Sequence, residues 1–89
     1  MYYVYLLENQ GDKSWYIGFT ANLRERIKQH QLGYGARTTQ RKLGWKVIYS
    51  EIYINKEDAT GREKFLKSGS GRKYLKKQLN HYLSKTLEK

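Results

Sequence analysis

One stretch, residues 16–30, constrains the fold more than any other part of the chain, because its hydrophobic period changes part-way. At its start large apolar side chains occupy every second position, which is the pattern of a β-strand. Further on, Asn22 is a favourable helix N-cap with Glu25 three residues later, the apolar spacing becomes helical, and Gly33 supplies a stop. The stretch therefore predicts a strand that leads directly into a helix.

The inward-facing stripe of that helix contains two polar residues. By spacing it consists of Leu23, Arg26, Ile27 and His30. Arg26 and His30 are four residues apart and hence lie on one side of the helix. Since burying a charge without a partner costs free energy, we expect a site for an anion at the rim of the core.

The composition favours a polyanion as the partner. Eighteen Lys and Arg against eight Asp and Glu give a net charge of +10 in 89 residues, which fit one domain, residues 1–89. The absence of cysteine excludes a disulfide framework, a thiolate zinc site and a cysteine nucleophile. No apolar run approaches the roughly 20 residues of a membrane span, and the first residues lack the basic start of a signal peptide. We therefore expect a cytoplasmic protein without membrane contact.

The rest of the chain predicts two more strands and two more helices. Residues 2–8 alternate as a strand and reach the next strand through a turn with Asn, Gly and Asp. Residues 45–54 predict a third strand that is well covered, since both of its faces are largely apolar. Asn55 caps a helix that ends at Gly69, and a last helix follows and frays after Leu83. The prediction is an α+β fold with a small three-stranded, mainly antiparallel sheet and the element order β-β-α-β-α-α.

Two tyrosines of the first two strands are candidates for a common site. Tyr5 and Tyr16 fall on one face if the strands pair in the right register. Gly18 leaves a gap on that face where a ligand can approach the backbone. The loop of residues 33–44 is rich in backbone donors, hydroxyls and cations, which suits phosphate binding as well as simple connection.

In this order and at these spacings, the polar residues resemble the GIY-YIG nuclease domain. The matching positions are Tyr3-Val4-Tyr5, Tyr16-Ile17-Gly18, Arg26, His30 and Glu63. Residues 33–39 and 59–67 also resemble compact single-domain bacterial members, so the resemblance covers most of the chain. Tyr3 is a departure, because the family's first motif has glycine there, and its ring would narrow or reshape the approach to the scissile phosphate.

The resemblance implies a small sheet packed with helices, one divalent metal ion, Mg²⁺ or Mn²⁺, and hydrolysis of DNA phosphodiester bonds. Carried over by position, it assigns Glu63 as the metal ligand and Arg26 as the phosphate-binding arginine. His30 becomes the assisting histidine, and Tyr5 and Tyr16 become the two motif tyrosines.

The same residue types suit phosphoryl chemistry without the resemblance. Mg²⁺ needs only one or two protein carboxylates, so Glu63 is sufficient, and the other carboxylates fall mostly at turns and solvent-facing positions. Arg26 can present a planar fork to phosphate oxygens. The general base stays open among Tyr5, Tyr16 and His30, because a phenol with a pKa of about 10 acts at neutral pH only if cations lower that pKa. Our hypothesis is that Tyr5 activates the water, with His30 taking its proton, while Tyr16 holds water or phosphate.

Further cations suit the DNA backbone on either side of the cut, where contacts carry little sequence information. Together with Gly18, the expected nucleic-acid-binding residues are Arg37, Arg41, Lys42, Arg72, Lys73, Lys76 and Lys77. Nothing in the sequence resembles a base-reading helix, so we expect recognition of shape.

Two hypotheses from different classes follow. The first is a metal-dependent DNA endonuclease of repair or recombination that acts on branched, damaged or otherwise non-specific DNA, with a protein partner supplying specificity. The second is a nucleic-acid-binding module of the same fold, for DNA or RNA, that cleaves weakly or not at all. A ribosome- or RNA-associated basic protein is a third.

Overall fold

The computed structural model describes residues 1–33 and 42–87. Its elements in chain order are the strands β1 (Tyr2–Asn9) and β2 (Trp15–Thr20), helix α1 (Leu23–Gln31), strand β3 (Trp45–Tyr53), and helices α2 (Lys56–Lys67), α3 (Gly69–Gln78) and α4 (Asn80–Leu87). The predicted α+β class and the three-stranded antiparallel sheet are confirmed. None of the described helices is long and apolar enough to cross a membrane.

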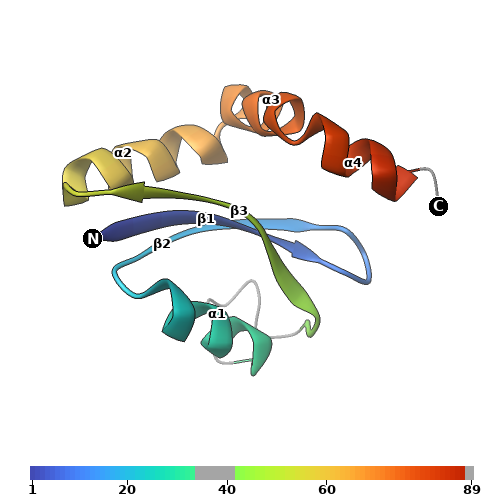
Figure 1. Cartoon of the computed structure of the whole chain (residues 1–89), viewed down its shortest axis with the longest axis horizontal. Helices are drawn as coiled ribbons and strands as arrows, with labels where there is room; N and C mark the ends of the chain where they lie inside the picture. The colour runs from blue at the N-terminus through green and yellow to red at the C-terminus, as the bar shows by residue number, and fades with distance from the viewer. Residues whose placement is uncertain (34–41, 88–89) are drawn as a thin grey trace.

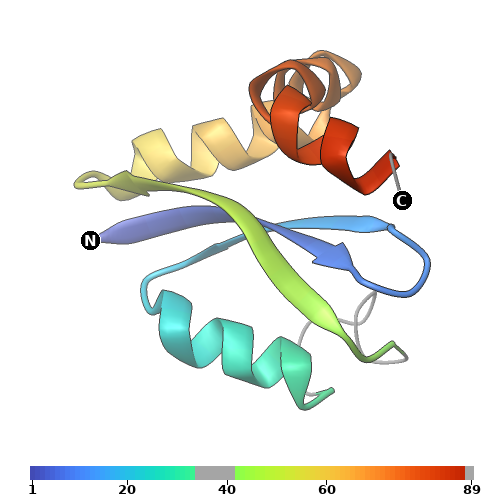
Figure 2. The ribbon, with the colours of Figure 1, turned by 45° about the vertical axis from the view of Figure 1, so that its right-hand side comes forward.

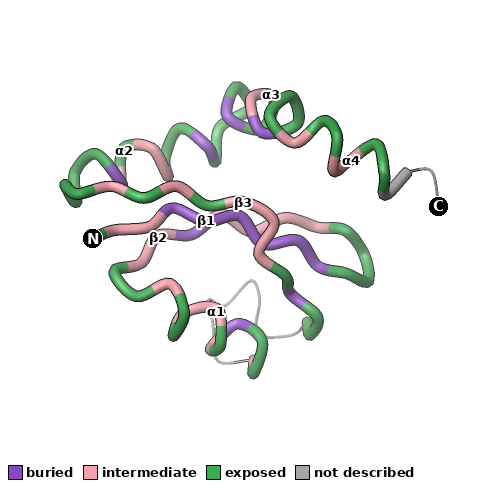
Figure 3. Tube along the Cα trace, in the orientation of Figure 1, coloured by how far each residue is buried: buried purple, intermediate pink, exposed green. Residues whose placement is uncertain are grey.

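The sheet has the strand order β2-β1-β3, so β1 is the central strand. Helix α1 covers one face of the sheet, and α2, α3 and α4 lie on the other (Figures 1 and 2). Because both faces are covered, β1 is buried along most of its length, as Figure 3 shows. The core on the α2 side consists of Val4, Leu6, Ala59, Leu66 and Leu75, and the core on the α1 side of Tyr5, Leu7 and Trp45.

Strand β3 is an edge strand, and the expectation that it is well covered is wrong. Its register against β1 shifts by one residue, which leaves Ile48 as a β-bulge. Before the bulge Trp45 and Val47 pack on the α1 side, whereas Tyr49 packs on the α2 side. Beyond it, Ile52 is 59% exposed. The two apolar faces in the sequence therefore come from a change of face within the strand.

The C-terminal part of the chain forms three helices, where two were expected. Asn55 caps α2 as predicted, and its side chain accepts hydrogen bonds from the backbone of Glu57 and Asp58. Ser68 ends α2 and also caps α3, so the expected stop at Gly69 is displaced by one residue. The last predicted helix is divided into α3 and α4, and α4 continues past Leu83, where fraying was expected.

Two carboxylates that were expected at solvent-facing positions instead hold the helices on the sheet. Glu8 is 2% exposed and accepts hydrogen bonds from the Tyr82 hydroxyl at 2.6 Å and from Trp15 Nε1 at 3.2 Å. This contact attaches α4 to β1. Glu51 of β3 accepts two hydrogen bonds from the Arg62 guanidinium of α2, at 2.9 and 3.0 Å. Burial of these carboxylates is tolerated because each is paired.

Candidate active site

The pairing of β1 with β2 brings the two candidate tyrosines together. Tyr5 lies opposite Gly18 and Leu7 lies opposite Tyr16, so the two phenols share the face that α1 covers. Their ring centroids are 6.3 Å apart. The common face that the sequence made conditional on register is confirmed.

Gly18 makes room for Tyr5. A Cβ atom at Gly18 would lie 2.3 Å from the Tyr5 hydroxyl oxygen and 2.4 Å from its Cζ atom. The prediction of an open gap over Gly18 is therefore wrong. The Tyr5 side chain fills the space through which a ligand would have reached the backbone. Gly18 supports the site by letting the phenol cross β2.

His30 completes a cluster of three rings. It is fully buried near the end of α1, and its Nε2 atom is 2.9 Å from the Tyr5 hydroxyl oxygen. Its ring centroid is 5.0 Å from that of Tyr16. Burial and the charge of Arg26 lower the pKa of His30 to about 4. The imidazole is therefore neutral at pH 7 and has one nitrogen that can accept a proton.

Burial raises the pKa of Tyr5 to about 12. A hydrogen bond from Arg26 and its charge act in the opposite direction, whereas the charges of Tyr16 and Glu63 raise the pKa further. The hypothesis of a tyrosine base needed cations to lower this pKa. In the protein alone the desolvation of the phenol outweighs Arg26, so such a base needs a further cation or transfer of its proton to His30.

Arg26 lies beside the ring cluster and is partly exposed to solvent. Its side chain is half-buried, interacts with Tyr5 and His30, and is held by Gln29, whose Oε1 accepts a hydrogen bond from Arg26 Nη1 at 2.8 Å. Gln29 was missed in the sequence, although its position three residues after Arg26 is the signal that could have indicated the contact. A guanidinium fixed beside a phenol and an imidazole is suited to bind a phosphate.

Glu63 belongs to α2, on the face of the sheet opposite α1. Its side chain is 22% exposed, and its Oε2 atom is 3.2 Å from Lys67 Nζ, one helical turn away. Across the sheet, the charge of Glu63 is the smallest of the causes that act on the pKa of Tyr5.

The rotation of α2 that places Glu63 is fixed by the preceding residue. The Arg62 guanidinium binds Glu51 with two nitrogens and lies 4.6 Å from the ring centroid of Tyr74 and 5.2 Å from that of Phe65. A two-point ion pair beside two aromatic rings allows the helix little freedom to turn. Arg62 therefore helps to direct the adjacent carboxylate.

The donor set suits a single hard cation. Among residues 1–33 and 42–87 no group of three or more His, Asp or Glu side chains is placed to hold a metal ion. Glu63 can supply one carboxylate oxygen from a partly exposed position. Mg²⁺ is commonly bound by one or two carboxylates together with water and substrate phosphate, so the residues present fit such an ion.

The cations expected on the DNA backbone do not surround the ring cluster. Arg72, Lys73 and Lys76 belong to α3, on the face of the sheet away from α1 (Figure 1). Arg37 and Arg41 lie outside the described residues, so their expected role stays a prediction.

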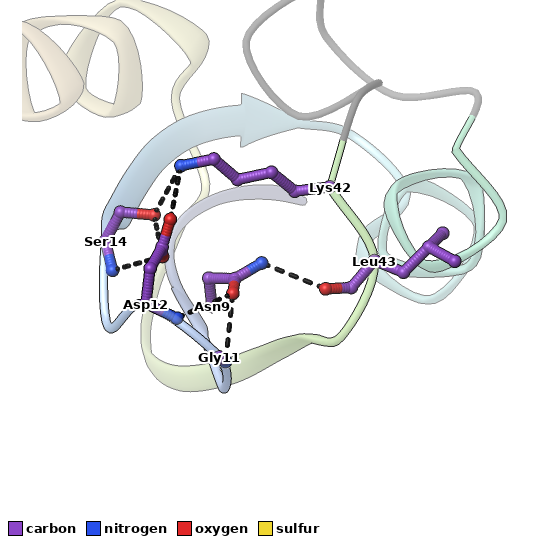
Figure 4. A network of polar contacts seen from close by, with 6 residues as sticks. All are labelled: Asn9, Gly11, Asp12, Ser14, Lys42 and Leu43. Carbon is purple, nitrogen blue, oxygen red and sulfur yellow. Dashed lines mark hydrogen bonds and ion pairs between the residues drawn. The ribbon is translucent and has the colours of Figure 1, made fainter.

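The Lys42 side chain contacts the turn between β1 and β2 (Figure 4). Its Nζ atom is 2.7 Å from Asp12 Oδ2 and donates to Ser14 Oγ at 3.1 Å. Hydrogen bonds from Lys42 and Ser14 hold the pKa of Asp12 well below its usual range. Asn9 Nδ2 adds a hydrogen bond to the carbonyl of Leu43 at 3.0 Å. Lys42 therefore ties the segment before β3 to the hairpin.

The family model for the GIY-YIG catalytic domain matches residues 1–81. The chain belongs to the GIY-YIG family. A UPF0213 protein of Clostridium perfringens is 43% identical over 67 residues, which cover 75% of this GIY-YIG chain and 71% of the relative. A UPF0213 protein of Streptococcus pneumoniae is 42% identical over 65 residues, or 73% of this chain and 65% of the relative, so the match spans just under two-thirds of that protein.

A solved structure agrees with the GIY-YIG assignment. The solution NMR structure of a UPF0213 protein of Bacillus halodurans superposes with a TM-score of 0.53 at 37% identity, and the match covers 92% of this chain and 85% of that one. The recognition made from the sequence is confirmed, and the chain is a compact member of a nuclease family.

Tyr3, at the glycine position of the GIY-YIG motif, lines a cavity of about 670 Å³ between β1 and α1. The other lining residues come from the start of α1 and along one side of that helix: Ala21, Asn22, Leu23, Arg24, Ile27, Lys28 and Gln31. The ring of Tyr3 is therefore one wall of a recess beside α1.

Proposed function

We propose that this GIY-YIG protein is a divalent-metal-dependent DNA endonuclease that hydrolyses phosphodiester bonds. The observation that supports this most is the buried hydrogen bond between the Tyr5 hydroxyl and His30 Nε2, with Arg26 and Glu63 both acting on the same phenol. Three groups from α1 and α2 thus act on one oxygen atom of β1. Such convergence is typical of sites that move a proton.

In the proposed mechanism Tyr5 and His30 act as a proton relay. The Tyr5 oxygen accepts a proton from the attacking water while its own proton passes to Nε2 of the neutral His30. The low pKa of His30 opposes this step in the free protein. A phosphate bound beside Arg26 offsets the charge that helps to lower that pKa, so the substrate itself makes His30 a better proton acceptor.

Arg26 and Glu63 are proposed to handle the phosphate charge. Arg26 donates hydrogen bonds to the non-bridging oxygens, and Tyr16 orients water or phosphate from the neighbouring ring. Glu63 is the protein ligand of Mg²⁺ or Mn²⁺, which when bound neutralises charge on the phosphate and on the leaving oxygen.

Cleavage of plasmid, branched and single-stranded DNA with Mg²⁺ or Mn²⁺ tests the proposal. The wild type is expected to cut, whereas Arg26→Ala and Glu63→Gln lose about 100-fold or more in rate and still bind DNA. Arg24→Ala on the same helix and Glu57→Gln on the same helix as Glu63 are matched controls at exposed positions and keep the rate. Equal loss in variant and control, or no cutting by any protein, would contradict the proposal.

A role for Tyr5 as the base has its own test. The pH profile of cleavage is compared for wild type, Tyr5→Phe and Tyr16→Phe. We expect Tyr5→Phe to lose most of its activity at every pH, and Tyr16→Phe to lose less. If both phenylalanine variants keep the wild-type rate, the tyrosine relay is wrong.

The second candidate is a nucleic-acid-binding module with little cleavage. It is favoured by the position of the α3 cations on the far face, where they can bind a strand without the ring cluster. Binding without cutting by the wild type and by both site variants would support it. We further propose that the enzyme acts on branched or damaged DNA during repair or recombination, in the cytoplasm, and that a partner protein adds specificity. Faster cleavage of branched DNA than of plasmid DNA would support the substrate part of this proposal.

A further inference from the structure

A second cavity lies on the face of the sheet opposite α1. It has a volume of about 510 Å³, within the range of small-molecule binding sites. Its walls come from the ends of β1 and β2 and from α3 and α4: Glu8, Lys13, Trp15, Arg72, Lys76, Asn80, Leu83 and Ser84. The residues proposed for catalysis are not among them.

The rim of this cavity is cationic. Lys13, Arg72 and Lys76 bring three positive charges from two different parts of the chain, and Glu8 is the one acid among the lining residues. Lys13 has a φ of 64°, a conformation that costs a residue other than glycine about 1 kcal/mol. Its backbone N–H donates a hydrogen bond to the Asn9 carbonyl oxygen at 2.8 Å, so this conformation belongs to the turn between β1 and β2, and the Lys13 side chain adds a cation to the cavity wall.

At the base of the cavity, the Glu8 carboxylate is held by hydrogen bonds from within the protein. It is buried and accepts hydrogen bonds from Tyr82 and Trp15, and its single negative charge faces three cations among the lining residues. The indole of Trp15 is half-buried, and the Arg72 guanidinium lies 5.4 Å from its ring. Indole and guanidinium planes are the surfaces on which unpaired bases stack.

Hydrogen-bonding groups complete the wall. Asn80 and Ser84 are four residues apart on α4 and present an amide and a hydroxyl to the same cavity. Leu83 adds an apolar contact beside them. The cavity thus combines cations, a flat aromatic surface and neutral donors and acceptors, which together match a nucleotide.

We propose that this cavity binds one unpaired nucleotide of a single-stranded nucleic acid. The phosphates lie against Lys13 and Lys76, and the base stacks on the Arg72 guanidinium, which itself lies over the Trp15 ring. A paired base in a duplex is stacked on both sides and cannot enter, so a duplex contacts the rim alone. The site is separate from the proposed catalytic cluster and does not depend on cleavage.

Fluorescence of Trp15 tests the proposal directly. The chain has two tryptophans, and Trp45 is 4% exposed in the core on the α1 side, so Trp45→Phe leaves Trp15 as the single reporter. In EDTA, octathymidylate is expected to change the Trp15 emission, and thymidine monophosphate to produce the same change at higher concentration. An eight-base-pair duplex and inorganic phosphate leave it unchanged.

A pair of adjacent lysines supplies the control. Both were expected from the sequence to contact the DNA backbone, but Lys76 lines the cavity whereas Lys77, next to it on α3, does not, so this site excludes Lys77. By anisotropy of labelled octathymidylate, Lys76→Ala in the otherwise wild-type chain weakens binding at least 5-fold. Its slope of log Kd against log salt falls by about 0.7, and Lys77→Ala changes Kd less than 2-fold. This measurement does not require Trp45→Phe to fold.

Three results would overturn the site. They are an unchanged Trp15 emission at saturating oligonucleotide, an equal effect of duplex or phosphate, and equal losses in the Lys76 and Lys77 variants. Failure of the endonuclease proposal would instead appear as absent cutting with this binding intact. The two proposals therefore fail independently.

Discussion

Tyr5 is the residue on which the site is centred. It is buried in the central strand, its hydroxyl oxygen is 2.9 Å from His30 Nε2, and Arg26 acts to lower its pKa. A buried phenol next to a buried imidazole costs desolvation for both, and their shared hydrogen bond offsets part of that cost. The pair is kept neutral by the same burial that raises one pKa and lowers the other.

His30 is expected to titrate with a pKa of about 4 in the folded protein. Since the unfolded histidine has a pKa near 6.5, the unfolded state binds more protons between these values. The free energy of unfolding therefore falls as the pH drops from about 6.5 to about 4, by on the order of 3 kcal/mol. NMR titration of the ring protons measures the pKa, and urea unfolding of wild type and His30→Asn measures the stability.

A pKa of His30 near 6.5, or a pH dependence of stability that is the same in His30→Asn, would contradict the assigned burial.

A second prediction at this scale concerns Gly18. Gly18→Ala places a methyl group against the Tyr5 ring and should destabilise the protein by about 1–3 kcal/mol through overpacking. Gly61→Ala, with no atom within 4 Å of its added Cβ and a position inside α2, should stabilise by up to about 1 kcal/mol. Chemical denaturation compares the two. Equal effects would mean that Tyr5 does not occupy the space over Gly18.

Sequence spacing placed Arg26 and His30 on one side of a helix, and Tyr5 and Tyr16 on one face only if their strands paired in the right register. That the two pairs meet in one site was implied by the resemblance to the GIY-YIG domain. The spacing did not predict that burial dominates the pKa of Tyr5, nor that Tyr5 covers Gly18. Both depend on how far the phenol extends across β2, which no local pattern records.

The close approach of α3 to α2 could not be predicted from the sequence. Gly71 lies where α3 meets α2, and a Cβ atom there would be 2.1 Å from the Phe65 carbonyl oxygen and 2.4 Å from the Leu66 Cα atom. Gly69, two residues earlier, has nothing within 4 Å of its added Cβ. The two glycines look alike in the sequence and differ only in what faces them.

Gly71→Ala should therefore destabilise the protein by about 1–3 kcal/mol, since backbone atoms must shift to admit the methyl group. Gly69→Ala should be neutral or slightly stabilising, because it only reduces the freedom of the unfolded chain. Thermal unfolding of both variants distinguishes them. A Gly71 variant as stable as the Gly69 variant would show that α2 and α3 do not approach this closely.

Helix caps were predicted well and strand exposure was not. Asn22 and Asn55 cap their helices because a side-chain oxygen needs only the next three residues. The bulge at Ile48 arises from pairing with β1, a distant segment, and it moves the side chains of β3 from one face to the other. A continuous alternation could not reveal that change.

For the whole molecule, the positive charge is divided between two faces. From the sequence, Arg72 and Lys76 were expected on the DNA backbone beside the cut, because a count of charges has no direction. In the structure Arg26 lies with α1, whereas Arg72 and Lys76 lie with α3 on the other face. One strand of nucleic acid that contacted both would have to pass around the edge of the sheet.

The central claim is that Glu63 of α2 and the Tyr5–His30 pair serve one metal-dependent site. NMR spectra recorded during addition of Mn²⁺ test it most directly, since the bound ion broadens signals of nearby groups. We expect broadening of the Tyr5 and His30 ring signals in wild type and Glu57→Gln, and its loss in Glu63→Gln. Sharp ring signals in wild type, or the same broadening in Glu63→Gln, would contradict the claim.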